Sequence, residues 1–365
     1  MIRWRSGVVT ALRREWPGAI EVDVQVTADG EPVPALAYPA LTGRPKPGDR
    51  ALLNTNALDK GLGTGGYALV VALPDRLPPG SDGPGHLVKA RYTPLQACVL
   101  GAEEQGSPYH ETLREADDLE SVPVVVADLH SALPAVLAGC RVSGGERLRA
   151  VYVMLDGGAL PAWFSRTVHG LREARWLAGT VTTGQAFGGD LEAVTVHSGL
   201  LAARHALGAD LIVVAQGPGN LGTGSRWGFS GVAAGEAVNA AAVLGGRPVA
   251  SLRISEADPR ERHNGISHHS LTTYGRVALA RASVVLPDLP GDFGARVAAA
   301  AAPLAVRHAL VTVSVAGLAD ALRSCPVRLS TMGRGLDQDL AYFLAAAAAG
   351  RHAAALAAGP AAREG

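Results

Sequence analysis

Short apolar runs rich in valine and isoleucine recur along most of the chain, and segments with helical composition separate them. The run LIVVAQ at 211–216 is typical, because β-branched residues fill it and no charge interrupts it. Such runs indicate strands covered on both faces, and strands alternating with helices build a mainly parallel sheet. We therefore predict an α/β fold with a doubly wound, Rossmann-like sheet. The strands predicted for it are 122–127, 149–155, 180–183, 210–216, 248–254, 283–286, 310–315 and 327–331.

The first part of the chain has a different pattern. Short strands with alternating apolar and polar residues, such as IEVDVQV, are separated by turns that contain proline or glycine. Evenly spaced strands of this kind predict a small β-barrel or sandwich. We assign this β domain to residues 1–80 and the α/β domain to 81–365, because LPDRLPPGSDGPG at 73–85 has the composition of a linker. The glycine cluster at 62–66 is either a corner of the barrel or a loop that contributes to the main site.

A glycine-rich loop follows the strand 210–216. The segment GPGNLGTGSRWGFSG has a proline that ends the strand, and its glycines let a ligand approach the backbone closely. Neither the ending of a Walker loop nor the glycine spacing of a dinucleotide fingerprint is present. The loop is predicted to bind an anion, the alternative being a tight connection that holds no ligand. The candidate ligand-binding residues here are Gly217, Gly219, Asn220, Gly222, Thr223, Gly224 and Ser225.

The densest run of ionisable residues, ADPRERHNGISHH, follows the next predicted strand. Histidine transfers protons near neutral pH, and arginine pairs with anions. The candidate acid–base residues are His263, His268 and His269, and the candidate anion contacts are Arg260 and Arg262. A second interpretation is a divalent metal held by Asp258, His263 and His268, although this spacing matches no recognised zinc pattern. A hydrogen-bonded structural cluster is the third.

Polar residues also follow other predicted strands at the same end. Asp156 follows strand 149–155, and Arg334 follows strand 327–331. Parallel strands all end at one edge of a sheet, so these residues are expected beside the glycine-rich loop. Asp156 is a candidate general base or metal ligand, or it fixes its own turn. Arg334 is a candidate contact for an anion, or it forms a surface salt bridge.

Charge balance and cysteine content limit the partners and the location. The 365 residues include 33 basic and 33 acidic side chains, which argues against general binding to nucleic acids or membrane surfaces. The three cysteines form no pair motif, and the N-terminal segment lacks the apolar stretch of a signal peptide, so a cytoplasmic protein is expected. The alanine-rich segment 344–358 is expected to be a packed helix, not a membrane span. The sequence leaves homo-oligomer formation open.

Several phrases of the sequence are distinctive when they are taken together. They are LLNTNALDKGLGTGGY, KARYTPLQ, PVVVADLHSALPAV, DGGALPAWFSR, FGGDLEAV, GPGNLGTGSRWGFSG, ISEADPRERHNGISHHSLT and STMGRG. The chain thereby resembles the bacterial domain-of-unknown-function family 3866 over nearly its whole length. The resemblance implies a bacterial cytoplasmic protein, and it carries no activity or catalytic residue with it. The candidate site residues therefore depend on the residue patterns alone.

Two functions from different classes fit these patterns. The first is an enzyme, a hydrolase or group transferase, that acts on a small anionic metabolite of phosphorylated or nucleotide-like character. Redox chemistry fits less well, because no fingerprint for NAD is visible. A serine triad fits less well, because no nucleophile elbow is visible. The second is a ligand-sensing or protein-interaction module that uses the same cleft without turnover. We favour the enzyme, because histidine-rich loops at strand ends serve proton transfer, and a divalent metal is one option for a cofactor.

Overall fold

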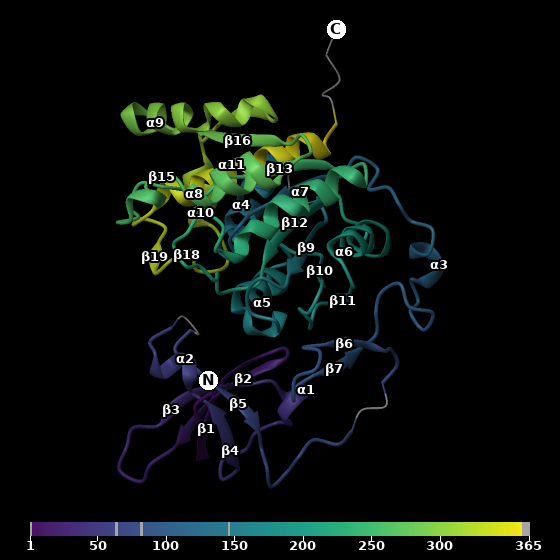
Figure 1. Ribbon diagram of the computed structural model, residues 1–365, viewed down its shortest axis with the longest axis vertical. Helices are drawn as coiled ribbons and strands as arrows, with labels where there is room; N and C mark the ends of the chain where they lie inside the picture. Colours follow the sequence, from purple (N-terminus) through teal and green to yellow (C-terminus); the bar gives the residue numbers. More distant parts are fainter. Residues whose placement is uncertain (1, 63–64, 81–82, 145–146, 360–365) are drawn as a thin grey trace. The chain divides into compact units, whose positions relative to one another are not determined.

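The structure, a computed structural model, describes residues 2–62, 65–80, 83–144 and 147–359 (Figure 1). The chain forms two compact units. The first comprises Met1–Pro84 and Ala90–Cys98, and the second comprises Gly85–Lys89 and Val99–Gly365. The short strands β6 (Leu87–Lys89) and β7 (Ala97–Val99) lie where the chain passes from one unit to the other.

The first unit contains a closed five-stranded barrel, in the order β1-β2-β3-β5-β4. Its elements are β1 (Trp4–Trp16), β2 (Ala19–Gln25), β3 (Val33–Ala37), α1 (Pro39–Thr42), β4 (Arg50–Asn54), α2 (Asn56–Asp59) and β5 (Ala68–Ala72). Alternation drives the closure, because Ile20, Val22 and Val24 all face the barrel core, where each is nearly inaccessible to solvent. The predicted barrel is confirmed in place of a sandwich. Of the predicted glycine cluster at 62–66, residues 63–64 lie outside the described residues.

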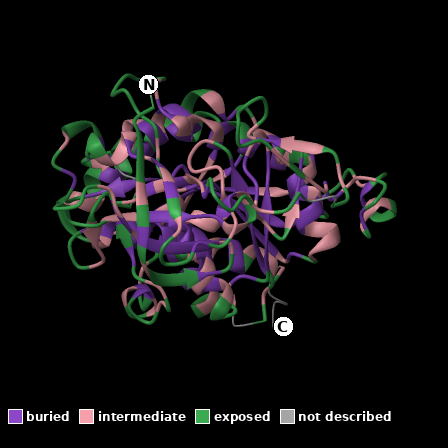
Figure 2. Cartoon of the chain, turned by 90° about the horizontal axis from the view of Figure 1, so that it is seen from below, coloured by how far each residue is buried: buried purple, intermediate pink, exposed green. Residues whose placement is uncertain are grey.

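The second unit is built on an eight-stranded sheet in which all neighbouring strands run parallel. Its strands, from one edge to the other, are β11 (Leu191–Glu192), β10 (Gly179–Thr182), β9 (Ala150–Leu155), β12 (Leu211–Gln216), β8 (Pro123–Val126), β13 (Arg247–Ser251), β16 (Ser283–Asp288) and β17 (Ala309–Ser314). The central strands carry the apolar runs of the sequence and are buried throughout (Figure 2). The predicted parallel α/β sheet is therefore confirmed.

Helices cover both faces of this sheet. One apolar cluster includes residues of α4 (Leu133–Gly144), α5 (Arg166–Glu173), α10 (Leu318–Arg323) and α11 (Leu340–Ala357). The other includes residues of α3 (His110–Leu113), α6 (Val196–Leu201), α7 (Ala233–Val243) and α9 (Gly291–Ala301). α8 (His268–Thr272) precedes β16, and its Leu271 packs against the second cluster. Because buried strand residues alternate between the clusters, both faces of each central strand are covered.

Helices α4 and α11 pack unusually closely, because glycine takes the place of a side chain at two contacts. A Cβ atom at Gly139 would lie 1.8 Å from the carbonyl oxygen of Ala347, and one at Gly350 would lie 1.9 Å from that of Val136. Among the described residues, α11 is the helix long and apolar enough to cross a membrane by length and composition, with 61% of it buried. The predicted packing of this alanine-rich segment within the fold is thus confirmed.

One predicted strand is wrong. Residues 327–331 do not add a strand to the parallel sheet; instead β18 (Ser330–Thr331) pairs antiparallel with β19 (Arg334–Gly335). The turn between them has positive φ at both Met332 and Gly333, which is the backbone of a two-residue hairpin. Residues 327–331 read VRLST, and so short an alternating segment does not by itself distinguish a sheet strand from a hairpin arm, which caused the error.

Candidate functional site

Strands β8 and β12 are neighbours, but the chain leaves them in opposite directions. After β8 it continues to β9, and after β12 it continues to β13 on the far side of β8. The helices that follow, α4 and α7, accordingly pack on opposite faces of the sheet. Loops that diverge from adjacent parallel strands are where open α/β sheets bind ligands. We therefore expect the candidate site among the segments that follow these strands.

The glycine-rich loop after β12 folds back on itself. Gly222 and Phe229 form an antiparallel bridge, and the Thr223 amide donates to the Gly228 carbonyl at 2.8 Å. The Ser225 hydroxyl accepts from the Gly228 amide at 3.1 Å and lies 3.0 Å from the Thr223 hydroxyl. The predicted anion contacts of Thr223 and Ser225 are thus engaged within the loop, which forms a small hairpin. Positive φ makes glycine the fitting residue at Gly224.

The start of this loop packs tightly against the loop after β9. A Cβ at Gly217 would lie 2.4 Å from the Ala159 carbonyl oxygen, and one at Gly158 would lie 2.1 Å from that of Gly217. Asn220 accepts hydrogen bonds from Gln216 at 2.9 Å and from Ser230 at 3.0 Å. Close backbone packing and internal hydrogen bonds thus occupy this half of the predicted ligand loop.

Two further glycines of the loop lie in open surroundings. Gly219 has a φ of 93°, and a Cβ added there would meet no described atom within 4 Å. At Gly224 the nearest contact of an added Cβ is Nη2 of Arg262, at 3.6 Å. The loop therefore reaches the ionisable run through Arg262.

Asp156 stabilises a turn in the structure. Its Oδ2 accepts a hydrogen bond from the Gln185 amide at 3.0 Å, and a Cβ at Gly184 would lie 2.4 Å from the same oxygen. The two loops that it joins follow β9 and β10. The sequence offered fixing of its own turn as the alternative to catalysis, whereas this hydrogen bond joins Asp156 to the loop after β10.

Arginine and aspartate side chains of the ionisable run form a network of ion pairs with residues from other parts of the chain. Asp258 accepts hydrogen bonds from Arg260 at 2.7 Å, Arg334 at 3.2 Å and the buried Arg253 at 3.4 Å. Arg334 also donates to Asp339 at 2.9 Å. The hydrogen bond from Arg260 is the main reason that the pKa of Asp258 lies far below its ordinary value. We call these five residues the ion network.

The ion network uses residues that the sequence assigned to ligands. Arg260 and Arg334 were predicted to contact an anion, yet each is paired with a carboxylate. Asp258 was a candidate metal ligand, yet its side chain is fully buried among arginines. Opposite charges that neutralise one another inside the fold have little left for a ligand.

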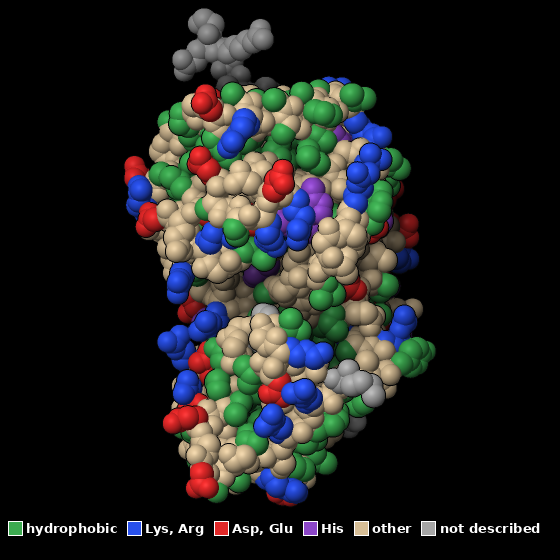
Figure 3. Space-filling model, turned by 60° about the vertical axis from the view of Figure 1, so that its left-hand side comes forward, with side chains coloured by type: hydrophobic (Ala, Val, Ile, Leu, Met, Phe, Trp, Pro, Cys, Tyr) green, Lys and Arg blue, Asp and Glu red, His purple; other side chains and the backbone are tan. Residues whose placement is uncertain are grey.

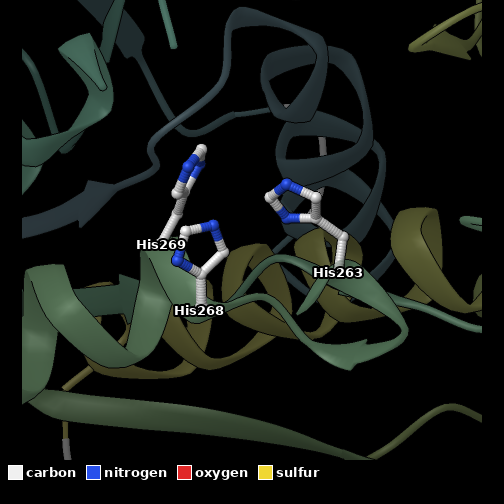
Figure 4. A group of neighbouring side chains, drawn as sticks. All are labelled: His263, His268 and His269. Carbon is white, nitrogen blue, oxygen red and sulfur yellow. The ribbon is translucent and has the colours of Figure 1, made fainter. Parts of the chain in front are cut away.

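Three histidines of the run meet in one place. His263 lies between β14 (Ile254–Ser255) and β15 (Gly265–Ile266), whereas His268 and His269 begin α8, after the N-cap residue Ser267. Their ring centroids lie 4.4 to 4.9 Å apart, and one nitrogen of each ring lies within 4.8 Å of the others (Figure 4). We call this group the histidine trio. The structure thus brings together all three predicted acid–base residues.

The surroundings of the trio keep its imidazoles neutral. Burial, followed by the charge of Arg253, lowers the pKa of His263 to about 3. Burial and the two neighbouring rings lower the pKa of His269 to about 3, and burial also lowers that of His268. Neutral imidazole is the form that accepts a proton or binds a metal.

An open pocket of about 810 Å³ lies against His268. Its lining includes Arg226, Arg262 and Arg276, together with apolar residues of α8 and the segment after α9. The lining contains no acidic residue, and none of these arginines is paired with a carboxylate within the described ranges. On the face drawn in Figure 3, basic side chains lie beside exposed histidine. We call this the arginine pocket.

Several buried polar atoms in these segments have no hydrogen-bond partner in the part of the chain that the structure describes. They are Asp128 Oδ2, Gln216 Oε1, His268 Nε2, His269 Nδ1, Thr273 Oγ1 and Asp339 Oδ1. A buried polar atom without a partner is destabilising, and folded proteins contain few of them. Burial correspondingly raises the pKa of Asp128 above its ordinary value. Unsatisfied buried atoms of this kind call for bound water, an ion or a ligand as their partner.

Sequence patterns missed some residues of the site. Arg253 closely follows the buried strand β13, and a charge in that position is a signal that was available. Arg276 lies four residues beyond Thr272 and eight beyond His268, so helical spacing predicts that the three share a face. Phe229 stacks on His269 with ring centroids 3.8 Å apart, a contact that no spacing reveals.

Comparison with known proteins gives a family and no activity. The model of the family described as "Protein of unknown function (DUF3866)" matches residues 34–350 of the chain. No curated protein matches the sequence.

Proposed function

The chain belongs to this family of proteins of unknown function, and from its own residues we propose that it is an enzyme, a hydrolase or group transferase, acting on a small anionic metabolite. The metabolite is of phosphorylated or nucleotide-like character. The single observation that carries the proposal is the arginine pocket next to the histidine trio.

The arginine pocket supplies positive charge that no carboxylate among its lining residues offsets. Arg226, Arg262 and Arg276 are all exposed and border one hollow. Guanidinium groups bind phosphate oxygens through paired, charge-assisted hydrogen bonds. A cleft lined by one sign of charge also raises the local concentration of the opposite ion. These properties support an anionic substrate with more than one oxygen at its charged end.

The histidine trio supplies the groups for chemistry. His268 belongs both to the trio and to the wall of the pocket, so a bound anion lies near the imidazoles. Neutral imidazoles bind metal ions, a role that serves hydrolysis and group transfer, whereas a pKa lowered to about 3 makes His263 and His269 weak bases near neutral pH. Asp156, which holds a turn in another loop, has no part in this proposal.

The fold supports the same place for the site. Helices cover both faces of the sheet, and the chain reverses its direction of travel beside β8. We include in the proposal that the sheet is doubly wound and Rossmann-like, because this arrangement places ligands at the reversal. A location in the bacterial cytoplasm stays a prediction.

Ligand-induced thermal stabilisation tests the proposal. The full chain is screened with inorganic phosphate, nucleoside monophosphates and sugar phosphates, alone and after Arg226→Gln with Arg262→Gln. A ligand at a hundred times its Kd adds about 2.7 kcal/mol of stability, which is easily measured. We expect the wild type to be stabilised and the double variant to lose that stabilisation.

The matched control is Arg281→Gln, another exposed arginine that lies outside the lining of the pocket. It should keep the full response to the ligand. Equal stabilisation of the double variant would show that the anion binds elsewhere. A ligand that is bound but never converted by the wild type would favour the sensing module over the enzyme.

A further inference from the structure

We propose that His263, His268 and His269 bind one divalent transition-metal ion, with zinc as the best match. The site is formed by residues from two separate segments, the turn before β15 and the start of α8. This inference deepens the proposed function and rests on it for the chemistry, whereas metal binding itself is measured separately.

The donor set selects the class of metal. Imidazole nitrogen suits zinc, copper, nickel and iron, whereas magnesium and calcium require oxygen ligands. Among the described residues, the group close enough to act together consists of histidines alone. Three histidines are a known set for catalytic zinc, in which water or substrate takes the fourth position.

The distances between the rings fit a site that closes slightly on the ion. The ligand atoms lie within 4.8 Å of one another. Bonds of about 2.0–2.1 Å to a tetrahedral zinc ion place ligand nitrogens about 3.3 Å apart. The three rings lie beside one another (Figure 4), and rotation of His268, the partly exposed ring of the three, shortens these distances.

Two of the nitrogens lack any other partner. His268 Nε2 and His269 Nδ1 are buried and accept no hydrogen bond from the described residues. Burial of an unpaired nitrogen is costly, and a metal ion would remove that cost by coordination. The unpaired nitrogens therefore point to a ligand independently of the spacing.

Neighbouring side chains fix the rings in the orientation that metal binding needs. Nδ1 of His263 forms a hydrogen bond with the Ser267 hydroxyl at 2.7 Å, which leaves Nε2 for the metal. The ring of His269 stacks on Phe229 with an interplanar angle of 2°. Metal-binding histidines commonly have the second nitrogen hydrogen-bonded, as His263 does. The residues that hold the rings, Ser267 and Phe229, thus lie outside the trio.

The positive charge nearby does not prevent binding. Arg253 and Arg260 lie in the ion network, where Asp258 accepts hydrogen bonds from both and offsets part of their charge. When bound, the metal would lower the pKa of its water molecule and supply a nucleophile for hydrolysis.

Metal content gives the first test. The full chain, without a polyhistidine tag, is stripped with a chelator, supplied with Zn²⁺ or Co²⁺, desalted and analysed by mass spectrometry of the metal. We expect one ion per chain and, with Co²⁺, the strong visible absorption of a tetrahedral complex. His268→Ala should lose both signals, because it removes one of three ligands.

The matched control is His197→Ala, an exposed histidine on α6, and it should bind the metal as the wild type does. Circular dichroism checks that each variant is folded. His268 is chosen because it is the partly exposed member of the trio, so its replacement disturbs packing least. A wild type that holds no metal, or a His268→Ala variant that holds as much as the wild type, overturns the inference.

The outcome is separable from that of the proposed function. Anion-induced stabilisation of the metal-stripped protein reports on the arginine pocket alone. Metal binding without any anion response leaves the inference standing and removes the proposed substrate class. An anion response without metal binding overturns the inference and leaves the proposed substrate class standing.

Discussion

The ion network and the arginine pocket lie in the same part of the molecule and use arginine in opposite ways. In the ion network, Arg253, Arg260 and Arg334 are held by two buried aspartates. In the arginine pocket, no acidic residue lines the wall. The same residue type is therefore structural where its charge is neutralised and available for a ligand where it is not. Arg260 and Arg262 are only two residues apart, yet Arg260 is paired with Asp258 and Arg262 lines the pocket.

Histidines show the same contrast. His130 has both ring nitrogens hydrogen-bonded, to Tyr152 at 3.0 Å and to Ser165 at 2.8 Å. In the histidine trio, by comparison, His268 and His269 each leave a buried nitrogen unpaired among the described residues. His352 on α11 also has a buried nitrogen without a partner among the described residues, so it is the clustering of such atoms that sets the trio apart.

Removal of the central carboxylate should have the largest effect. In Asp258→Asn the guanidinium of Arg253, which is 3% exposed, loses its charged partner. Breaking a buried ion pair in this way costs about 3 kcal/mol of stability, which urea denaturation measures. The control is Asp320→Asn, whose pair with Arg323 lies at the surface and should change stability by less than about 1 kcal/mol. An equal loss of stability in both variants would contradict the distinction between buried and surface ion pairs.

His130 should contribute to the pH dependence of stability, in the same direction as the buried histidines of the trio. Burial lowers the pKa of His130 to about 4, whereas the unfolded chain binds the proton at its ordinary value. The unfolded state thus binds more protons as the pH falls below about 6.5, and stability falls with it. His130→Gln should reduce the stability difference between pH 7 and pH 5 by about 2 kcal/mol. Denaturation at the two pH values measures this, and His197→Gln should keep the wild-type difference.

A matched pair of arginine variants compares the two regions directly. Arg262→Gln should weaken binding of the anion about tenfold and leave stability nearly unchanged, because a charge-assisted hydrogen bond to the ligand is lost. Arg260→Gln should leave the affinity unchanged and cost about 1 kcal/mol of stability, since it removes one partner of Asp258. Calorimetric titration and urea denaturation of both variants measure the two quantities. Equal affinities of the two variants for the anion would show that Arg260 and Arg262 contribute alike to binding. The distinction between the ion network and the arginine pocket would then be wrong.

The smallest effect is expected in the glycine-rich loop. Gly224 has a φ of 81°, so Gly224→Ala should cost about 1 kcal/mol through backbone strain. The added Cβ would lie in ordinary contact with Arg262, at 3.6 Å, so anion binding should be unchanged. Gly222→Ala is the control, because an added Cβ there meets nothing closer than 3.9 Å. Thermal unfolding with and without phosphate compares the two.

Much of the fold follows from the sequence. The apolar runs that become β8, β9 and β12 predict buried parallel strands, since only a strand covered on both faces needs such composition. Alternation in β2 similarly predicts the barrel wall. The hairpin of β18 and β19 was beyond reach, because the alternating segment VRLST at 327–331 has the same pattern as a sheet strand.

The location of the site follows from the sequence better than the roles of its residues. Histidines and arginines clustered after strands indicate a functional edge. Pairing depends on tertiary contacts, however, and Arg334 meets Asp258 across a separation of 76 residues. No local pattern distinguishes Arg262, which faces the pocket, from Arg260, which is neutralised.

The position of α11 has a consequence for synthesis. This helix contacts strands across the sheet and fills one of its faces, yet it follows all eight strands in the chain. As the polypeptide emerges from the ribosome, the barrel is complete early, whereas the larger unit stays open along one apolar face until Leu340–Ala357 arrives. During that interval the nascent chain exposes apolar surface, which makes it prone to aggregation. The close packing of α4 and α11 through their glycines is then the last part of the structure to form.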